Sequence, residues 1–313
     1  MGNRPWLDTR VLIDALADAF GESRGAVTPE TYRSVGGGSI NEAYRLTLRG
    51  GREVFLKSHR SPPPGMFAAE RAGLEALRAT NTICVPEVYA HHDPEPGSGD
   101  PGFGAAGFLV MEALELGRTT PHSEALLGER LAALHRCTSD RADPPRYGFA
   151  GDNFIGATPQ PNPRTASWIA FFREHRLEFQ RKLLIENGHQ GLERDLGLLI
   201  DSLDWALIEP DEGPALIHGD LWSGNRLTLA SGEPAIIDPA AYDGHREAEL
   251  AMMTLFGRPT SRFFEAYDAA FRREPGHERR EAVYQLYHVL NHANLFGSGY
   301  LGQARALLTR ILG

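Results

Sequence analysis

Two carboxylates and one amide lie close together in the second half of this chain. Asp220 precedes Asn225 by five residues, and Asp238 follows Asn225 by thirteen. Phosphoryl transfer from a nucleotide uses an aspartate that orients the acceptor hydroxyl, followed by an asparagine and a second aspartate that bind magnesium. Mg2+ is usually held by one or two side-chain oxygens together with phosphates, so Asn225 and Asp238 suffice as metal ligands. The spacing predicts a phosphotransferase centre with Asp220 as its catalytic residue.

Short strands are expected to position these three side chains. The apolar run 215–217 reads as a buried strand end, which places Asp220 on a loop held by a rigid element. Apolar residues alternate on both sides of a turn at 230–234, which predicts a hairpin that returns Asp238 to the side of Asn225. The alternative is that residues 218–220 form only a tight turn, and the two metal-ligand candidates in register argue against it.

The first third of the chain carries the candidate phosphate-binding residues. A Gly-rich turn between two predicted strands could let backbone amides approach phosphates, although by itself it could equally be an ordinary turn; it comprises Gly36, Gly37, Gly38 and Ser39. Lys57 ends an apolar strand, where a phosphate-binding lysine is found in protein-kinase-like folds. Glu70, early in the next predicted helix, is its expected ion-pair partner, and Glu75 is a rival. Both charges could instead be solvated surface groups.

A strand at 108–111 leads into the segment expected to read adenine through its backbone. Glu112, Ala113 and Leu114 are the candidates for these contacts. Because main-chain groups would do the binding, residue identity offers no support, and an ordinary buried strand is an equal alternative.

The remaining patterns predict an α+β fold with two lobes. Residues 1–115 contain a helix at 7–20, strands at 32–35, 42–48 and 53–57, a helix at 67–80, an extended segment at 85–90 and a Gly- and Pro-rich loop at 92–107. Residues 116–313 are mostly helical, with predicted helices at 123–138, 166–187, 192–208, 248–256, 262–271 and 281–295. We expect a small antiparallel sheet lobe, a larger helical lobe, and a cleft between them.

Bulk composition excludes several classes of protein. The 313 residues include 32 basic and 41 acidic ones, and this formal net charge of -9 argues against a nucleic-acid partner. No apolar run is long enough to cross a membrane, and the first residues lack a signal-peptide core, so a cytoplasmic location is expected. The only cysteines, Cys84 and Cys137, are far apart, which supports neither a disulfide framework nor a zinc site.

The motifs together resemble the fructosamine kinase, or ketosamine-3-kinase, family, which has a protein-kinase-like fold related to aminoglycoside and choline kinases. The match spans nearly the whole chain, and the segments that carry it are 36–41, 54–57, 110–112, 218–225 and 238–247. The forms of 221–225 and 238–240 favour this family over the aminoglycoside kinases.

The resemblance implies that ATP, with Mg2+, phosphorylates the 3-hydroxyl of a sugar joined to an amine by a ketoamine linkage. The phosphorylated adduct then breaks down and releases the amine, so the enzyme would start a deglycation repair. The acceptor could be a free ketosamine of the fructosamine, ribulosamine or erythrulosamine type, or a glycated lysine on a protein. By position, Asp220 would be the base, Asn225 and Asp238 the metal ligands, and Lys57 with Glu70 the phosphate-binding pair. A monomer is expected.

Two candidate substrate contacts complete the site. Trp222, beside the catalytic aspartate, resembles a platform for the sugar or its amine, and a buried structural indole is the alternative. Many relatives read Asn-His-Trp-Asn-His-Phe-Gly near the end, whereas this chain has Ala293 and Leu295 at the Trp and second His positions. His292 remains as a candidate substrate contact, with a core histidine as the alternative. Some relatives carry a cysteine where Ser39 stands, so no disulfide switch is expected here.

Some charged clusters have no clear role in the sequence. His245, Arg246, Glu247 and Glu249 follow the second aspartate, and Glu249 is a candidate brace for the catalytic loop. A solvated helix terminus would explain the same cluster. The two histidines His91 and His92 have no other metal ligands near them in the sequence and are expected to lie exposed in a loop.

Two competing functions stay open at this point. One is phosphorylation of an aminoglycoside or another amino alcohol by the same machinery. The other is an inert nucleotide-binding module that regulates a partner, against which the presence of Lys57, Asp220, Asn225 and Asp238 argues.

Overall fold

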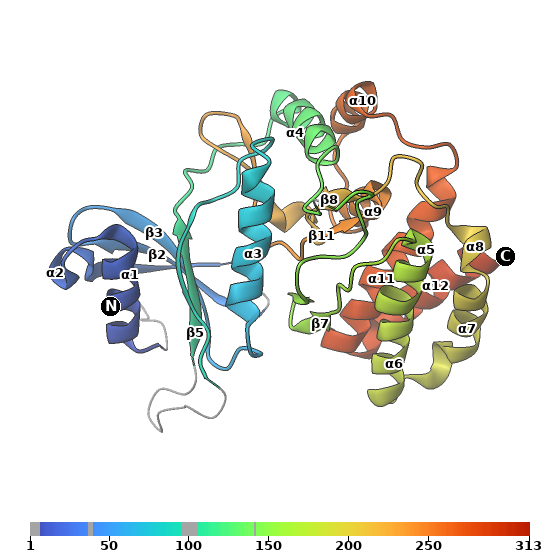
Figure 1. Ribbon diagram of the computed structural model, residues 1–313, viewed down its shortest axis with the longest axis horizontal. Coiled ribbons are helices and arrows are strands. Elements are labelled where there is room, and N and C mark those ends of the chain that lie inside the picture. Colours follow the sequence, from blue (N-terminus) through green and yellow to red (C-terminus); the bar gives the residue numbers. More distant parts are fainter. Residues whose placement is uncertain (1–6, 37–39, 96–105, 141) are drawn as a thin grey trace.

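The computed structural model describes residues 7–36, 40–95, 106–140 and 142–313, and in it a sheet and a helical body lie side by side (Figure 1). The sheet has five antiparallel strands in the order β1-β2-β3-β5-β4. Their bounds are β1 Pro29–Val35, β2 Glu42–Leu48, β3 Glu53–His59, β4 Val88–His92 and β5 Gly107–Glu112.

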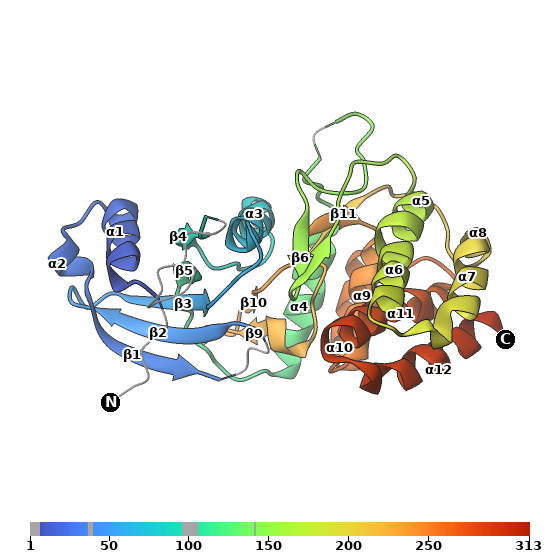
Figure 2. The same cartoon turned by 90° about the horizontal axis from the view of Figure 1, so that it is seen from below.

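Strand β5 lies at the centre of the packing in this region because both of its faces are buried. Phe108 and Val110 join the core under α1 (Thr9–Phe20), whereas Leu109 and Met111 join the core that contains α3 (Met66–Ala79). The alternation follows from the period of two in a strand. A short helix, α2 (Arg24–Val27), connects α1 to the sheet. The second core continues from α3 into the helical body, so α3 joins the two parts (Figure 2).

The helical body surrounds three small strand pairs. Its helices are α4 Pro121–Leu134, α5 Trp168–Phe172, α6 Phe179–Glu186, α7 Glu193–Asp201, α8 Leu203–Ala206, α9 Arg246–Leu255, α10 Ser261–Ala270, α11 His277–Phe296 and α12 Leu301–Leu312. A π-helical stretch, Arg173–Glu178, joins α5 to α6. Single 3-10 turns occur at Gln190–Leu192, Ser223–Asn225 and Ser298–Tyr300.

Three strand pairs place the loops of the predicted catalytic centre. Strand β8 (Ala215–Ile217) pairs with β11 (Tyr242–Gly244), and β9 (Arg226–Thr228) pairs with β10 (Pro234–Ile236). The third pair, β6 (Asn153–Ile155) with β7 (Thr158–Gln160), lies against the same region, because the Asn153 side chain donates to the carbonyl of Ala241 at 2.8 Å.

Several expectations about elements need correction. Besides the short strands expected around the catalytic motif, the part expected to be mostly helical also contains β6 and β7, which precede the motif and were not predicted. His91 and His92 lie in β4 and are partly buried, not in an exposed loop. The terminal helix α12 was not predicted, and the helix expected at 192–208 is divided into α7 and α8. Within the described residues, no helix has the length and apolarity needed to cross a bilayer.

Candidate active site

A cleft of about 890 Å³ lies where the sheet meets the helical body. Its lining comes from both parts of the molecule. Strands β2, β3 and β5 and helix α3 contribute on one side, and the catalytic loops, the β6–β7 hairpin and α11 contribute on the other. Of the described candidate residues, all line it: Gly36, Lys57, Glu70, Glu112, Ala113, Leu114, Asp220, Trp222, Asn225, Asp238 and His292. Gly37, Gly38 and Ser39 lie outside the described residues.

The loop after β8 presents Asp220 through a conformation that requires glycine. Gly219 has a φ of +82°, and a Cβ atom built on it would lie 2.2 Å from the carbonyl oxygen of Ala240. Both features exclude larger residues, because positive φ strains L-residues and the neighbouring backbone has no room to give. His218 fixes the loop on either side: its Nδ1 accepts from the Asp220 amide at 3.2 Å, and its Nε2 donates to the Ile237 carbonyl at 2.7 Å.

Asn225 connects the two aspartate loops. Its side-chain amide donates to the backbone carbonyls of Asp220 at 2.8 Å and of Asp238 at 3.4 Å. Because both partners are acceptors, the NH2 group must face them, and Oδ1 is left as the oxygen available to a cation. The sequence-predicted hairpin therefore brings residues 220, 225 and 238 to one place.

Asp238 is positioned by its own backbone conformation and by an ion pair with Lys57. Its φ of +58° is in the left-handed region, which aspartate tolerates better than most residues but which still costs energy. Its Oδ1 lies 3.0 Å from Nζ of Lys57, which is itself 2.8 Å from both carboxylate oxygens of Glu70. Glu70, not Glu75, is thus the partner of Lys57, whereas Glu75 pairs with Arg71. An amide oxygen and a carboxylate that converge in this way fit a Mg2+ ion, since they are hard oxygen donors.

The surroundings of the centre raise the pKa values of both Asp220 and Lys57. Burial raises the pKa of Asp220 well above its ordinary value; the nearby carboxylates of Asp238 and Glu249 add to this rise and Lys57 opposes it. Burial by itself would lower the pKa of Lys57, but Asp238 and Glu70 raise it above its ordinary value. Lys57, only 7% exposed, is therefore charged at neutral pH and suited to bind phosphate oxygens.

Glu249 on α9 braces the catalytic loop from below. One carboxylate oxygen, Oε2, accepts from the backbone amides of His218 and Gly219. The residue is 1% exposed, so these hydrogen bonds are formed in a region of low dielectric, where they are strong. The expected role as a brace thus has a direct structural counterpart.

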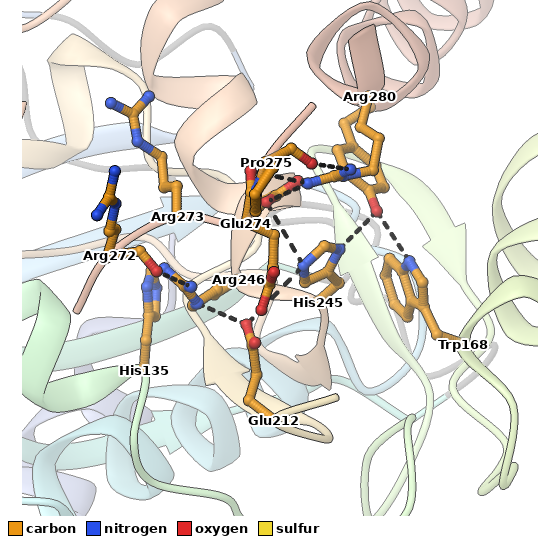
Figure 3. A network of polar contacts seen from close by, with 12 residues as sticks. His135, Trp168, Glu212, His245, Arg246, Arg272, Arg273, Glu274, Pro275 and Arg280 are labelled. Atoms are coloured by element: carbon orange, nitrogen blue, oxygen red, sulfur yellow. Dashed lines mark hydrogen bonds and ion pairs between the residues drawn. The ribbon is translucent and has the colours of Figure 1, made fainter. Parts of the chain in front are cut away.

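The start of α9 is anchored by a buried polar network (Figure 3). His245 Nδ1 bonds the hydroxyl of Tyr284, which also accepts from Trp168 Nε1 at 3.0 Å. Arg246 donates a hydrogen bond to Glu212 at 2.6 Å. Arg280 donates two hydrogen bonds to the Glu247 carboxylate, at 2.6 and 2.8 Å. The alternative of a solvated helix terminus is wrong, because none of residues 245–247 is more than 4% exposed.

The two ends of the cleft differ in character. At the sheet end, Arg45 of β2 pairs with Glu53 at 2.6 Å and donates to the carbonyl of Leu114 at 3.3 Å, which ties the strand to the segment after β5. At the other end, the Trp222 ring packs over Gly224, and His292 donates from Nδ1 to the carbonyl of His288 at 2.8 Å. Trp222 and His292 are only partly buried, so the reading of either as a pure core residue is not supported.

Sequence reasoning missed cleft residues that come from distant elements. Arg45, Phe154 of β6, Phe256 after α9 and Tyr300 after α11 all line the cleft. None lies in a motif, and only the fold brings them together. Within the described residues, no cluster of three or more His, Cys, Asp or Glu side chains could hold a metal.

Known proteins resemble this chain along nearly its whole length. The family model for fructosamine kinase matches residues 12–313. A probable ketoamine kinase of Synechocystis sp. is 43% identical over 280 residues, which cover 90% of each chain. A chloroplastic protein-ribulosamine 3-kinase of Oryza sativa subsp. indica is 40% identical over 282 residues, covering 88% of this chain and 77% of the relative.

A solved structure supports the fold directly. The crystal structure of a provisionally assigned fructosamine-3-kinase from Haemophilus somnus superimposes with a TM-score of 0.83. Its sequence is 26% identical, and the match covers 96% of this chain and 97% of the other. The predicted α+β fold, with a small antiparallel sheet beside a larger helical part, is confirmed.

Proposed function

Because this chain belongs to the fructosamine kinase family and is an ATP-dependent kinase, we propose that it phosphorylates the sugar 3-hydroxyl of a ketosamine. The observation that carries the proposal is the convergence of Asp220, Asn225 and Asp238 in a cleft that also contains Lys57. The names of its relatives, ketoamine kinase and protein-ribulosamine 3-kinase, support a ketosamine as acceptor.

In the proposed reaction, Asp220 positions the 3-hydroxyl and takes its proton. The sugar oxygen forms a bond to the γ-phosphorus while the bond from that phosphorus to the bridging oxygen breaks, and ADP leaves with the electron pair. Lys57 binds phosphate oxygens and is kept in place by Glu70. Asn225 Oδ1 and the Asp238 carboxylate would hold Mg2+, which supplies neutralisation of phosphate charge. Most of the rate gain then comes from positioning and electrostatics.

Backbone groups at the end of β5 and in the segment after it are proposed to bind adenine. The amide of Glu112 donates to Glu87 at 2.8 Å, and the carbonyl of Leu114 accepts from Arg45, so both groups are already used. We assign adenine recognition to the carbonyl of Glu112 and the amide of Leu114, with Ala113 between them. Gly36 and its neighbours Gly37, Gly38 and Ser39 are assigned to the phosphates by their place in the family motif.

The acceptor is proposed to lie over Trp222 and beside His292. If Nδ1 of His292 donates to the His288 carbonyl, the neutral ring offers Nε2 as an acceptor for a substrate hydroxyl or ammonium. The ketosamine is proposed to be either free or attached to a protein lysine. The protein itself is proposed to be a monomer located in the cytoplasm.

An acceptor panel tests the proposal. The purified protein is incubated with ATP and Mg2+ and with fructosamine, ribulosamine and erythrulosamine adducts or with aminoglycosides, and ADP release is followed. We expect turnover with at least one ketosamine and a 3-phosphate product identified by NMR. Turnover of aminoglycosides alone would overturn the acceptor assignment, and ATP binding without turnover of any alcohol would favour the regulatory module.

A further inference from the structure

An aromatic wall of four side chains forms part of the cleft lining that the helical body contributes. It consists of Phe256 after α9, His292 and Phe296 of α11, and Tyr300 in the following 3-10 turn. The ring of His292 lies 4.7 Å from that of Phe256, 5.5 Å from that of Phe296 and 5.1 Å from that of Tyr300. These separations are those of packed aromatic pairs, so the wall is one continuous surface.

This aromatic wall begins directly beside the catalytic loop. The amide of Ser223 donates to the carbonyl of Phe256 at 3.1 Å, and Trp222 is the preceding residue. An acceptor whose hydroxyl is at Asp220 therefore extends across Trp222 onto the wall. In a ketosamine the amine is attached to C1, only two carbon atoms from C3, so a substituent on the amine is within reach of this surface.

Charge is distributed unevenly along the cleft. Among the described lining residues, the cationic side chains are Arg45 and Lys57, and both belong to the sheet. At the aromatic wall, burial lowers the pKa of His292, so its ring is neutral at physiological pH. A carboxylate placed there would lose hydration without gaining a cationic partner, which is unfavourable.

Part of the aromatic wall remains accessible to a ligand. Phe296 is 49% exposed although it lines a cleft, and the neighbouring Leu295 adds further apolar surface. Covering such surface with an apolar group is favourable, and aromatic side chains contribute most.

We propose that the aromatic wall is an apolar subsite for the amine substituent, so that the enzyme prefers ketosamines of aromatic or alkyl amines over those of carboxylate-bearing amino acids. The inference rests on the proposed function, because it names the class of ketosamine that this active site takes. Phe296 and Tyr300 then determine acceptor specificity.

Three adducts of one ketose test the subsite. They carry ethylamine, phenethylamine or phenylalanine, and the last differs from the second only by its carboxylate. We expect kcat/KM for the phenethylamine adduct to exceed that for the ethylamine adduct by about tenfold, the order expected for extra apolar contact. We expect the phenylalanine adduct to be about tenfold poorer than the phenethylamine adduct, because its carboxylate is desolvated.

Variants locate the effect on the aromatic wall. Phe296→Ala should lower kcat/KM for the phenethylamine adduct about tenfold more than for the ethylamine adduct. Trp205→Ala is the matched control, because Trp205 is 64% exposed on α8, outside the cleft lining, and this variant should leave all three values unchanged. Thermal unfolding of each variant shows that it is folded.

The outcomes separate this inference from the function on which it rests. Equal kcat/KM values for the three adducts in the unmodified enzyme would overturn the subsite while leaving ketosamine phosphorylation intact. An unchanged phenethyl-to-ethyl ratio in Phe296→Ala would overturn the role of Phe296. Absence of turnover with every ketosamine of the acceptor panel would reject the proposed function and the subsite together.

Discussion

Asp220 combines the properties that a proton acceptor for an alcohol needs. Its backbone is fixed by His218 and Asn225, so the carboxylate is positioned before substrate binds. Its raised pKa makes it a stronger base than an ordinary aspartate. Both properties depend on its surroundings, and they lead to two separate predictions.

Substitution of Asp220 by asparagine should remove the base and keep the shape. We expect kcat to fall by about 10²- to 10⁴-fold, the usual contribution of general base catalysis, while ATP affinity stays within a few-fold. Steady-state kinetics and nucleotide titration measure the two quantities. Asp211→Asn, at an exposed position, is the control and should behave like the unmodified enzyme. Unchanged kcat in Asp220→Asn would remove Asp220 from the chemistry.

The pH dependence of activity should report the raised pKa of Asp220. The protonated acid accepts no proton, so activity is present above this pKa and is lost as pH falls through it. We expect the acid limb of kcat/KM to have its midpoint above the ordinary aspartate value of about 3.9. The profile should be recorded with a stability check at each pH. A midpoint at or below that value, in folded protein, would contradict the assignment.

At the scale of elements, the catalytic centre is a set of loops held by short strands and one helix. Strands β8, β9, β10 and β11 contain only three residues each. Such short pairs give little stability by themselves, so the loops depend on the hydrogen bonds that reach them from α9 and Asn225. The buried network around His245 and Arg246 fixes α9 and, through Glu249, the loop that carries Asp220.

Gly219 is a position in this loop that tolerates a side chain poorly. Gly219→Ala places a methyl group against the Ala240 carbonyl and also strains a positive φ, whereas Gly213→Ala strains a φ of +75° with no atom within 4 Å. We expect Gly219→Ala to lower the free energy of unfolding by about 2 kcal/mol more than Gly213→Ala, because overpacking adds to strain. Chemical denaturation measures both. Equal losses would show that the Ala240 contact relaxes without cost.

Elements with a regular apolar pattern were predictable from sequence. The strand at 42–48 was located because its apolar residues alternate with polar ones, and buried side chains do alternate with partly buried ones along it. The hairpin before Asp238 was located by the turn at 230–234 and the apolar residues on both sides of it. The β6–β7 pair lacked this signal because its buried side chains include Asn153 and Gln160, which satisfy each other by a hydrogen bond of 2.8 Å. Gly297 and Gly299 precede helix α12 and Gly302 lies in its first turn, and these glycines interrupt the helical pattern.

The same reasoning explains which site residues were predictable. Asp220, Asn225 and Asp238 are near one another in sequence, and their carboxylate and amide groups indicate a base and metal ligands. Arg45 and Phe256 are separated by more than half the chain, and an isolated arginine or phenylalanine carries no local signal for a cleft. Their convergence follows from packing that sequence patterns do not specify.

At the scale of the whole molecule, buried neutral histidines couple stability to pH. Burial lowers the pKa of His288 to about 3, and burial likewise lowers the pKa of His135 and, to well below its ordinary value, that of His245. Each is neutral in the folded protein at pH 7, whereas the unfolded chain binds protons near pH 6.5. Their contribution to stability is present above that pH and is lost as pH falls below it.

Acid should therefore destabilise the protein through these histidines. Each should cost about 1.4 kcal/mol per pH unit between pH 6.5 and its folded pKa. Unfolding in urea at pH 7.5 and 5.5 measures the loss. His288→Phe should make this loss of unfolding free energy smaller by the contribution of one histidine. His122→Asn, at an exposed position, should leave the loss unchanged. A loss as large in His288→Phe as in the unmodified protein would show that His288 does not contribute.

Gly156, in the turn between β6 and β7, marks the place where the sheet and the helical body meet above the cleft. A Cβ built there would lie 2.9 Å from Ile40, which follows the Gly-rich turn, and 3.0 Å from Leu295 of α11. Ile40 and Leu295 therefore both lie close to the Gly156 backbone. A side chain at position 156 would consequently have to displace residues from both parts of the molecule, so close packing, together with a φ of +64°, explains why glycine stands in this turn.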